Sequence, residues 1–235
     1  MQIYFRACEK QETISYVDRW KEVSKTEILK KCWLSLQKSI TSEDRVVIIH
    51  DSVSKETLEF MQRTASGMIF LQEVPNHEWG YHLHTVTMVN LLEKECLNSN
   101  SREVFYLVED DYLHTPNALH VIRDMMKYWG HFGVPYDYPD RYKTPTNTQV
   151  FVGPDRHWRT VPSSTMTIFA HAQTWLSHIE ALKDCAPTSN DQVFQDIFQK
   201  EACLSPLPGI ASHLTPYHMT PLVDWNSIWN SINVG

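Results

Sequence analysis

The sequence has little cysteine, and its cysteines are not spaced for metal or disulfide chemistry. The five cysteines are an odd number and include no C-x-x-C pair, which argues against a disulfide framework and against a zinc knuckle. No apolar run approaches the length of a membrane-spanning helix, and the first residues, MQIYFRACEK, lack the basic, apolar and small-residue order of a secretory signal. We therefore expect a cytoplasmic protein with no membrane span.

An excess of basic residues is also missing. The 21 Lys and Arg residues are outnumbered by 28 Asp and Glu residues, which gives a formal net charge of -7. This charge argues against nucleic acid as the main partner, because binding to a phosphate backbone depends on clustered Lys and Arg. Hydrophobic residues make up 42% of the chain, which is ordinary for a soluble globular protein, and 235 residues suffice for one sizeable domain.

The most informative stretch is VFYLVEDD, at residues 104–111. Five apolar residues run directly into three acids, which is typical of a strand that is buried on both faces and delivers acids at its carboxyl end. Because side chains alternate along an extended chain, Glu109 and Asp111 should share one side while Asp110 takes the other. Two carboxylates aimed at one point repel each other unless a cation lies between them, which favours a hard divalent metal. The alternative is a solvated acidic turn ahead of a helix.

The first half of the chain alternates strand and helix patterns. Capping signals begin at Ser24 and Ser54, and Thr115-Pro116 reads as the start of a later helix. Helical spacing is found at residues 25–40, 54–63 and about 81–96, and strand-like runs are found at residues 3–7, 45–50, 68–71 and 104–111. This alternation predicts an α/β fold with a mostly parallel sheet covered on both sides by helices. A ligand site is expected where the carboxyl ends of the strands meet.

The pattern changes after Trp129. Residues 148–152 and 158–170 are strand-like and flank the turn sequence GPDR, so we expect an added antiparallel hairpin. Ser189 with Gln192 matches a capping box that would open a helix through Phe198. The tail from residue 204 onward contains four prolines and no clear period, and we expect it to be a lid or wrap instead of a core element.

Several side chains could contribute to a site at this edge. Asp51 ends the second strand, although a turn or helix cap is the simpler interpretation. His213 and His218 lie in the loop sequence SHLTPYH and could complete a nitrogen and oxygen ligand set for manganese, although loop histidines are usually just exposed. Asp191 lies in the first turn of a helix, either as a general base or as an acid favoured by the helix dipole.

Arginine and aromatic residues give weaker signals. Arg156 and Arg159 flank Trp158 and could hold an anionic group, or they could be surface charge at a turn. Trp79 and Tyr81, with Gly80 between them, line a ligand cleft or simply pack.

The order of these parts resembles a GT-A fold glycosyltransferase. The resemblance rests on an acid after the second strand, a DxD-like triplet after an apolar strand, an antiparallel hairpin, an acid at a helix start and a histidine in a C-terminal loop. It covers most of the chain, from about Ile3 to Trp225, as an order of elements and not as close sequence identity. It implies a GT-A-like, Rossmann-like sheet with an added hairpin and a C-terminal loop segment, in a single domain over residues 1–235. That domain would comprise a nucleotide-sugar-binding half (1–129), an acceptor-side half (130–203) and a closing segment (204–235).

The resemblance also implies roles for individual residues. The expected enzyme is a hexosyltransferase-type glycosyltransferase that moves a sugar from a nucleotide-diphosphate sugar to a glycan or other hydroxyl acceptor. Asp111 and His213 would bind Mn²⁺ or Mg²⁺, and Asp191 would be the catalytic base of an inverting reaction. Binding of the donor nucleotide sugar is assigned to Asp51, Glu109, Asp110, Arg6, Gly80 and Arg156.

The chain departs from the family pattern at two places. Glu109 replaces the first Asp of the DxD, and Asn190-Asp191 replaces an acidic pair. Two alternative functions use the same residues. One is a metal-dependent nucleotidyltransferase or hydrolase, and the other is a non-catalytic module that binds a nucleotide or a sugar.

Overall fold

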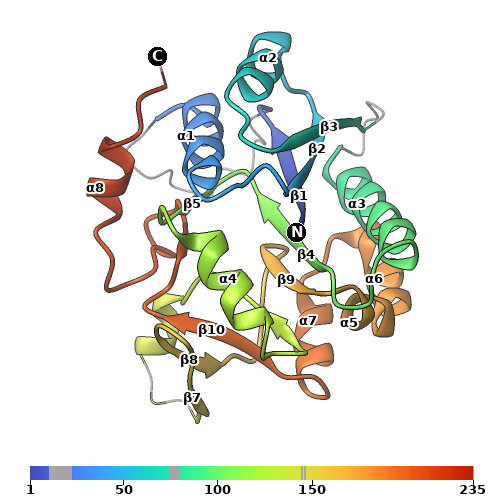
Figure 1. Cartoon of the computed structure of the whole chain (residues 1–235), viewed down its shortest axis with the longest axis vertical. Coiled ribbons are helices and arrows are strands. Elements are labelled where there is room, and N and C mark those ends of the chain that lie inside the picture. Colours follow the sequence, from blue (N-terminus) through green and yellow to red (C-terminus); the bar gives the residue numbers. More distant parts are fainter. Residues whose placement is uncertain (11–22, 75–79, 144, 146, 235) are drawn as a thin grey trace.

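A nine-stranded sheet forms the centre of the molecule. Figure 1 shows the computed structural model of the chain, which describes all residues except 11–22, 75–79, 144, 146 and 235, and does not describe the side chains of residues 80–82. The strand order is β3-β2-β1-β4-β9-β6-β10-β8-β7. The first four of these strands are parallel to one another: β1 (Gln2–Cys8), β2 (Arg45–Asp51), β3 (Met68–Glu73) and β4 (Val104–Glu109). The predicted parallel half is confirmed.

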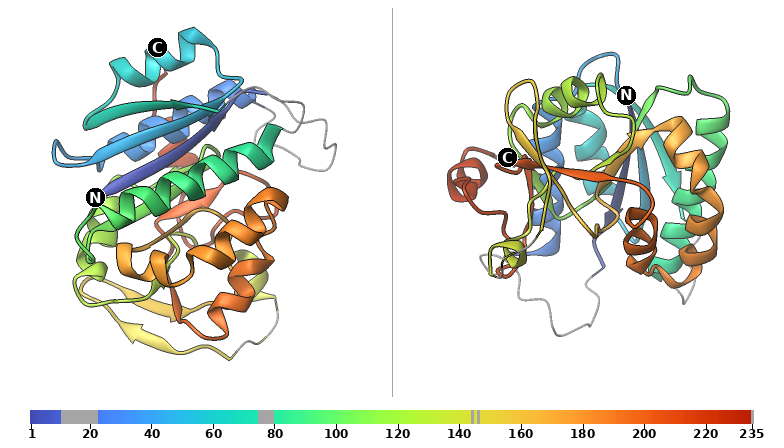
Figure 2. Two further views of the ribbon diagram at one scale, coloured as in Figure 1. Left: turned by 90° about the vertical axis from the view of Figure 1, so that its right-hand side faces the viewer. Right: turned by 90° about the horizontal axis from the view of Figure 1, so that it is seen from below.

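Helices cover both faces of this sheet, as the alternation of patterns predicts. On one face, α1 (Lys25–Gln37), α2 (Lys55–Arg63) and α4 (Ala118–Met126) pack against side chains of β1, β2 and β4. On the other face lie α3, α5, α6 and α7, which Figure 2 (left) shows turned toward the viewer. Their bounds are Gly80–Leu97, Ala172–Ser177, Ile179–Cys185 and Gln192–Phe198. The result is a three-layer α/β fold with a core on each side of the sheet.

Local capping agrees with the sequence at two helices and differs at two others. The Ser24 and Ser54 side chains accept hydrogen bonds from the backbone N–H of Glu27 and Thr57, as predicted. The helix after the acidic triplet has Asn117 as its N-cap, not Thr115. The capping box at Ser189 is wrong, because this residue has a φ of 48° and ends the short 3₁₀ helix η3 (Ala186–Thr188). Asp191 is the N-cap of α7 and makes no side-chain capping bond.

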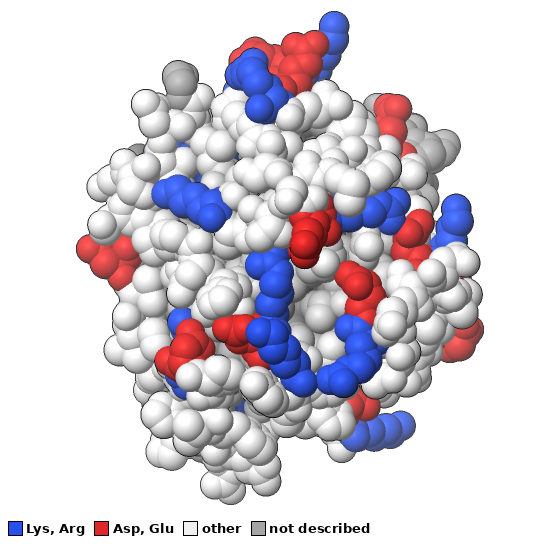
Figure 3. Space-filling view, viewed as in Figure 1, with Lys and Arg blue, Asp and Glu red and all other residues white. Residues whose placement is uncertain are grey.

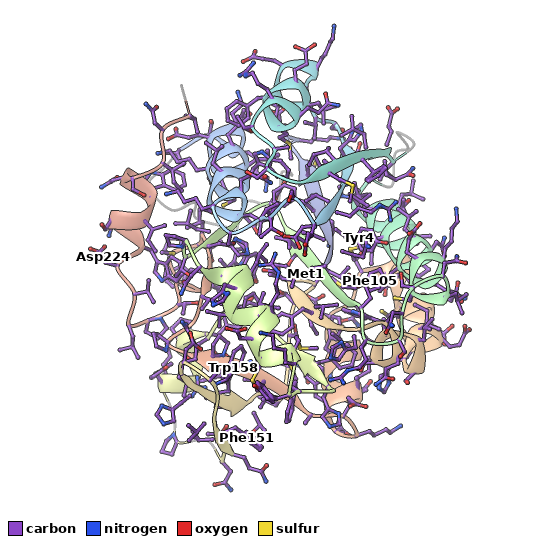
Figure 4. All side chains as sticks on the ribbon, in the orientation of Figure 1. Met1, Tyr4, Phe105, Phe151, Trp158 and Asp224 are labelled. Carbon is purple, nitrogen blue, oxygen red and sulfur yellow. The ribbon has the colours of Figure 1, made fainter. Side chains whose placement is uncertain are left out.

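The second half of the chain completes the sheet with shorter strands. The predicted hairpin is formed by β7 (Val150–Val152) and β8 (His157–Thr160), and Figure 4 labels Phe151 and Trp158 on its two strands. The continuous strand expected at residues 158–170 is wrong. The segment after β8 contains Pro162, which has no backbone N–H to donate, and the chain then enters a second strand, β9 (Ile168–His171), which pairs antiparallel with β4.

The C-terminal tail is largely a core element, which corrects the expectation of a lid. Strand β10 (Cys203–Leu207) lies between β6 (Phe132–Gly133) and β8 inside the large sheet. Strand β11 (Ala211–His213) pairs with β5 (Tyr112–His114) in a separate two-stranded ribbon. Helix α8 (Trp225–Asn230) follows Asp224, which Figure 4 labels at the outer edge, and its two tryptophans are buried against residues of α1.

The face that carries the amino ends of the parallel strands has charges of both signs. Figure 3 shows blue and red side chains interspersed on this face, so its Lys and Arg residues do not form a uniformly basic surface. In the part of the chain that the structure describes, no helix combines the length and the apolar character needed to cross a membrane.

Candidate active site at the carboxyl ends of the parallel strands

The carboxyl ends of β1, β2 and β4 bring the predicted site residues to one edge of the sheet. The register pairs Arg6 with Glu109 and Cys8 with Asp51. Figure 2 (left) shows β1 running from the N-terminal label toward the opposite side of the molecule, where this edge lies. The edge therefore carries the end of the VFYLVEDD stretch together with the ends of two neighbouring strands.

Each acid of the triplet has its own cationic partner. Glu109 Oε1 lies 3.5 Å from Nη1 of Arg6, and Asp110 forms an ion pair with Lys25. Asp111 Oδ2 lies 3.1 Å from Nε2 of His213. The predicted alternation agrees with this arrangement, because Asp110 turns to Lys25 while Glu109 and Asp111 interact electrostatically with each other and both with His213. The interpretation as a solvated acidic turn is wrong, because Asp110 is only 7% exposed.

Asp110 connects three elements and does not project into open space. Its Oδ2 accepts a 2.8 Å hydrogen bond from the backbone N–H of Cys8, and its Oδ1 accepts one from Nζ of Lys25, the first residue of α1. Burial acts to lower the pKa of Lys25, but the carboxylates of Asp110 and Asp111 outweigh it and raise this pKa. Asp110 thus ties β1 and α1 to the end of β4.

Asp111 and His213 form an ion pair at the end of the triplet. Burial acts to raise the pKa of Asp111, but the charges of His213 and Lys25 outweigh it and hold this pKa below its ordinary value. The His213 ring stacks on Tyr112 at 5.0 Å and on His218 at 5.5 Å. His218 instead shares a hydrogen bond of 2.8 Å between its Nδ1 and Oγ1 of Thr215. Of the two loop histidines, His213 is therefore the one that faces the acids.

A divalent metal fits this pair. A carboxylate oxygen and an imidazole nitrogen are ligands that manganese accepts, and a metal bound here would replace the proton that His213 Nε2 shares with Asp111 Oδ2 at 3.1 Å. Among the described residues, no group of three or more His, Cys, Asp and Glu side chains is arranged to hold an ion. A metal bound here would therefore have two protein ligands and would take further oxygen ligands from a substrate, as Mg²⁺ commonly does from phosphates.

Asp191 reaches the same place from the second half of the chain. Burial, followed by the charge of Glu109, raises its pKa to about 7, while Arg6 opposes the shift. A hydrogen bond of 2.8 Å between Thr85 Oγ1 of α3 and Ser189 Oγ fixes the segment that precedes it. Asn190 and Gln192, which flank Asp191, line a depression of 430 Å³ between α6 and α7.

The other predicted residues lie at varied distances from these acids. Asp51 is 8% exposed at the end of β2 and accepts a hydrogen bond of 2.9 Å from Ser52 Oγ. Arg156 contacts Asp155 and the Pro208 carbonyl in the hairpin turn.

Four further residues were singled out by the sequence analysis. Arg159 is buried and forms an ion pair with Asp137. Gly80 and Tyr81 are the first two residues of α3, the side chain of Tyr81 is not among those that the structure describes, and Trp79 lies outside the described residues.

Solved structures similar to this chain include glycosyltransferases. The galactosyltransferase LgtC, in complex with donor and acceptor sugar analogs, has a TM-score of 0.44 and 13% sequence identity over 86% of this chain and 67% of its own. An active-site mutant of LgtC has the same TM-score and coverage at 15% identity. Mouse xyloside xylosyltransferase 1, in its apo form, has a TM-score of 0.40 and 9% identity over 85% of this chain and 74% of its own. No protein-family model and no curated protein sequence matches the chain. Similarity this remote assigns no activity, because one fold carries many functions.

Three residues near the acids were missed by the sequence analysis. Lys25 could have been found, because it follows the Ser24 N-cap and so begins a helix next to the end of the first strand. Thr167, whose Oγ1 donates to Glu109 Oε2 at 3.2 Å, lies just before β9 and has no local signal. His84 lies on the buried side of α3, where a histidine at helical spacing looks like any core residue.

Proposed function

We propose that the chain is a metal-assisted glycosyltransferase that moves a sugar from a nucleotide-diphosphate sugar to an acceptor hydroxyl. One observation carries the proposal. A carboxylate whose pKa is near neutrality, Asp191, interacts electrostatically with Glu109 and Arg6, while Asp111 of the same acidic triplet faces His213. A proton acceptor and a proposed cation-binding pair thus belong to one cluster, and an inverting, metal-assisted sugar transfer uses both. The resemblance of the sequence to the GT-A pattern supports the same function.

The cation-binding pair would serve the departing diphosphate. The bond between the anomeric carbon and the phosphate oxygen breaks, and its electron pair leaves with the nucleoside diphosphate. Asp111 and His213 would hold Mn²⁺ or Mg²⁺, which when bound stabilises the negative charge that develops on the diphosphate. Lys25 adds a fixed positive charge behind the triplet through Asp110, which keeps Asp111 ionised and able to bind a cation.

Asp191 would accept the proton of the acceptor hydroxyl. As the acceptor oxygen forms its bond to the anomeric carbon, the hydroxyl proton passes to the Asp191 carboxylate. Burial and Glu109 raise the pKa of Asp191 to about 7, so near neutral pH the group can both hold and release a proton. A base on the face opposite the leaving group gives inversion at the anomeric carbon. Proton acceptance by a positioned carboxylate typically contributes about 100- to 10,000-fold to the rate.

The remaining assignments concern the nucleotide and the triplet. In this proposal Asp51 contacts the base of the nucleotide; the resemblance implies that Glu109 or Asp110 lies near the ribose, and Glu109 takes this place. Asp110 acts indirectly, because its two oxygens already bind Lys25 and the Cys8 N–H. The donor, the acceptor and the sugar are to be identified by experiment.

The test begins with binding and ends with products. Nucleotide-diphosphate sugars are screened by thermal shift with and without Mn²⁺, because a ligand of the native state raises the melting temperature. The expected donor is then incubated with acceptors, and the products are a nucleoside diphosphate and an inverted glycoside. Asp191→Asn should bind this donor and transfer no sugar, while the control Asp124→Asn, on α4, should behave as the wild type.

Each alternative outcome points to a different function. Release of pyrophosphate would identify a nucleotidyltransferase, and binding without turnover by the wild type would identify a binding module. Retention of configuration, or full transfer by Asp191→Asn, would remove Asp191 from the role of base.

A further inference from the structure

One buried side chain near the acids lacks a hydrogen-bond partner. His84, on α3, is 4% exposed, and its Nε2 has no partner among the described residues. Buried polar atoms in native proteins are almost always hydrogen-bonded, so an orphan needs an explanation such as a ligand. Neither the sequence analysis nor the roles assigned above involve this histidine.

The environment of His84 defines which chemical group it can receive. The Ile49 backbone favours a proton on the ring nitrogen that faces it, and Nε2 has no partner among the described residues, so a neutral ring protonated at Nδ1 carries its lone pair on Nε2. Burial, followed by the positive charge of Arg6, lowers the pKa of His84 to about 3. The imidazole is therefore neutral at every pH at which the protein would work, and its Nε2 is an acceptor.

Arg6 supplies the complementary donor. Its Nη1 lies 3.5 Å from Glu109, but its Nε is buried and has no partner among the residues that the structure describes. In the sheet register Arg6 lies opposite Ile49 on one side and Glu109 on the other, and its positive charge acts on His84, Glu109 and Asp191. The unsatisfied donor and the unsatisfied acceptor thus lie beside the residues assigned to transfer.

We propose that Arg6 Nε and His84 Nε2 recognise a hydroxyl group of the donor's transferred sugar, an inference that rests on the proposed function. A hydroxyl accepts from Arg6 and donates to His84 at the same time. A phosphate or carboxylate oxygen cannot donate to His84, and the carboxylates of Glu109 and Asp191 would repel it. The subsite therefore selects neutral sugars that carry a free hydroxyl at one ring position.

Deoxy donors test this recognition directly. The nucleotide sugar that the wild type turns over is compared with its analogues that each lack one hydroxyl. One analogue should lose about 10- to 100-fold in kcat/KM with the wild type, because the site's polar atoms are then left unpaired. His84→Phe should lose a similar factor with the parent donor and should no longer distinguish the parent from that analogue. His84→Gln, which keeps an acceptor oxygen, should regain part of the discrimination.

Two controls separate recognition from structural damage. His171→Phe replaces another buried histidine, at the amino end of β4, and should discriminate among the donors as the wild type does. The nucleoside diphosphate alone should bind His84→Phe as tightly as it binds the wild type.

The possible failures are distinguishable. Two results would overturn the subsite: equal losses of kcat/KM for all deoxy donors, or weaker binding of the nucleoside diphosphate to His84→Phe. His84 would then have a structural role or would bind a water molecule. If the wild type turns over the donor and His84→Phe is also fully active, this inference alone is overturned. A wild type that turns over no nucleotide sugar would overturn the proposed function as well.

Discussion

Asp111 Oδ2 lies 3.1 Å from His213 Nε2, although 102 positions separate the two residues in the sequence. The ribbon of β5 and β11 brings them together, because it pairs Tyr112 with His213 in register. The backbone N–H of Leu214 also donates to the Asp111 carbonyl at 2.9 Å. Backbone hydrogen bonds therefore fix the positions of both residues.

Removal of either member of this pair should weaken metal binding. In the presence of a nucleoside diphosphate, Mn²⁺ should raise the melting temperature of the wild type. Asp111→Asn and His213→Ala should each weaken Mn²⁺ binding by at least about 10-fold, because each removes one of only two protein ligands. The measurement is the Mn²⁺ titration of the melting temperature. Asp124→Asn should respond as the wild type does, and an unchanged response of Asp111→Asn would place the metal elsewhere.

The parallel half of the fold was predictable because its signals are local. Apolar runs of strand length, together with the caps at Ser24 and Ser54, mark each element without reference to distant residues. Acids at the ends of parallel strands then meet at one edge by geometry alone. The meeting of Asp191 with Glu109 depends on the α3 contact at Ser189, for which the sequence gives no sign.

Strand β10 shows why the tail was misread. Proline is normally confined to the edges of sheets, since it cannot donate to a ladder, yet Pro206 lies in β10 opposite Trp158 of β8, inside the large sheet. Neighbouring interactions support the strand, such as the 2.6 Å hydrogen bond from Ser205 Oγ to the Tyr136 carbonyl. Such support comes from tertiary contacts, which a single sequence does not reveal.

Lys25 should prove essential for stability because it neutralises a buried acid. Lys25→Met would leave the Asp110 carboxylate, 7% exposed, without its cation, and should lower the free energy of unfolding by about 3–5 kcal/mol. Adding Asp110→Asn should recover part of this loss, because no buried charge then remains. Urea unfolding measures all three proteins.

A surface pair provides the control for Lys25. Lys55 forms an i,i+4 pair with Glu59, and their side chains are 90% and 59% exposed, so Lys55→Met should change stability by less than about 0.5 kcal/mol. Equal effects of Lys25→Met and Lys55→Met would show that the Lys25 pair is not buried in solution.

Helix α8 should behave as a fixed part of the fold and not as a lid. Trp229 is 4% exposed, and Lys31 of α1 lies 4.6 Å above its ring while donating to the Trp229 and Ile232 carbonyls. Trp229→Ala should therefore lower the free energy of unfolding by about 3–5 kcal/mol. Leu222→Ala, at a residue that is 75% exposed, should have little effect in the same urea titration. A Trp229→Ala protein as stable as the wild type would show that α8 does not pack on α1.

Ionisation of the Asp191 carboxylate should lower the free energy of unfolding at neutral pH. Its pKa rises from 3.8 to about 7 on folding, so between these pH values the native protein keeps a proton that the unfolded chain releases. The free energy of unfolding therefore falls as pH rises through this range, and the penalty is complete above pH 7. Asn cannot ionise, so Asp191→Asn should match the wild type near pH 4 and exceed its stability by about 2–4 kcal/mol at about pH 8.

Urea unfolding of the wild type and Asp191→Asn at about pH 4, 6 and 8 measures this difference, and the common titrations of all other groups cancel when the two proteins are subtracted. Asp196→Asn, at an exposed position on the same helix, should show no pH-dependent gain. A difference between wild type and Asp191→Asn that stays constant with pH would mean that ionisation of Asp191 carries no penalty in the fold. Its carboxylate would then lie in water, and the burial that makes it a base near neutral pH would be absent.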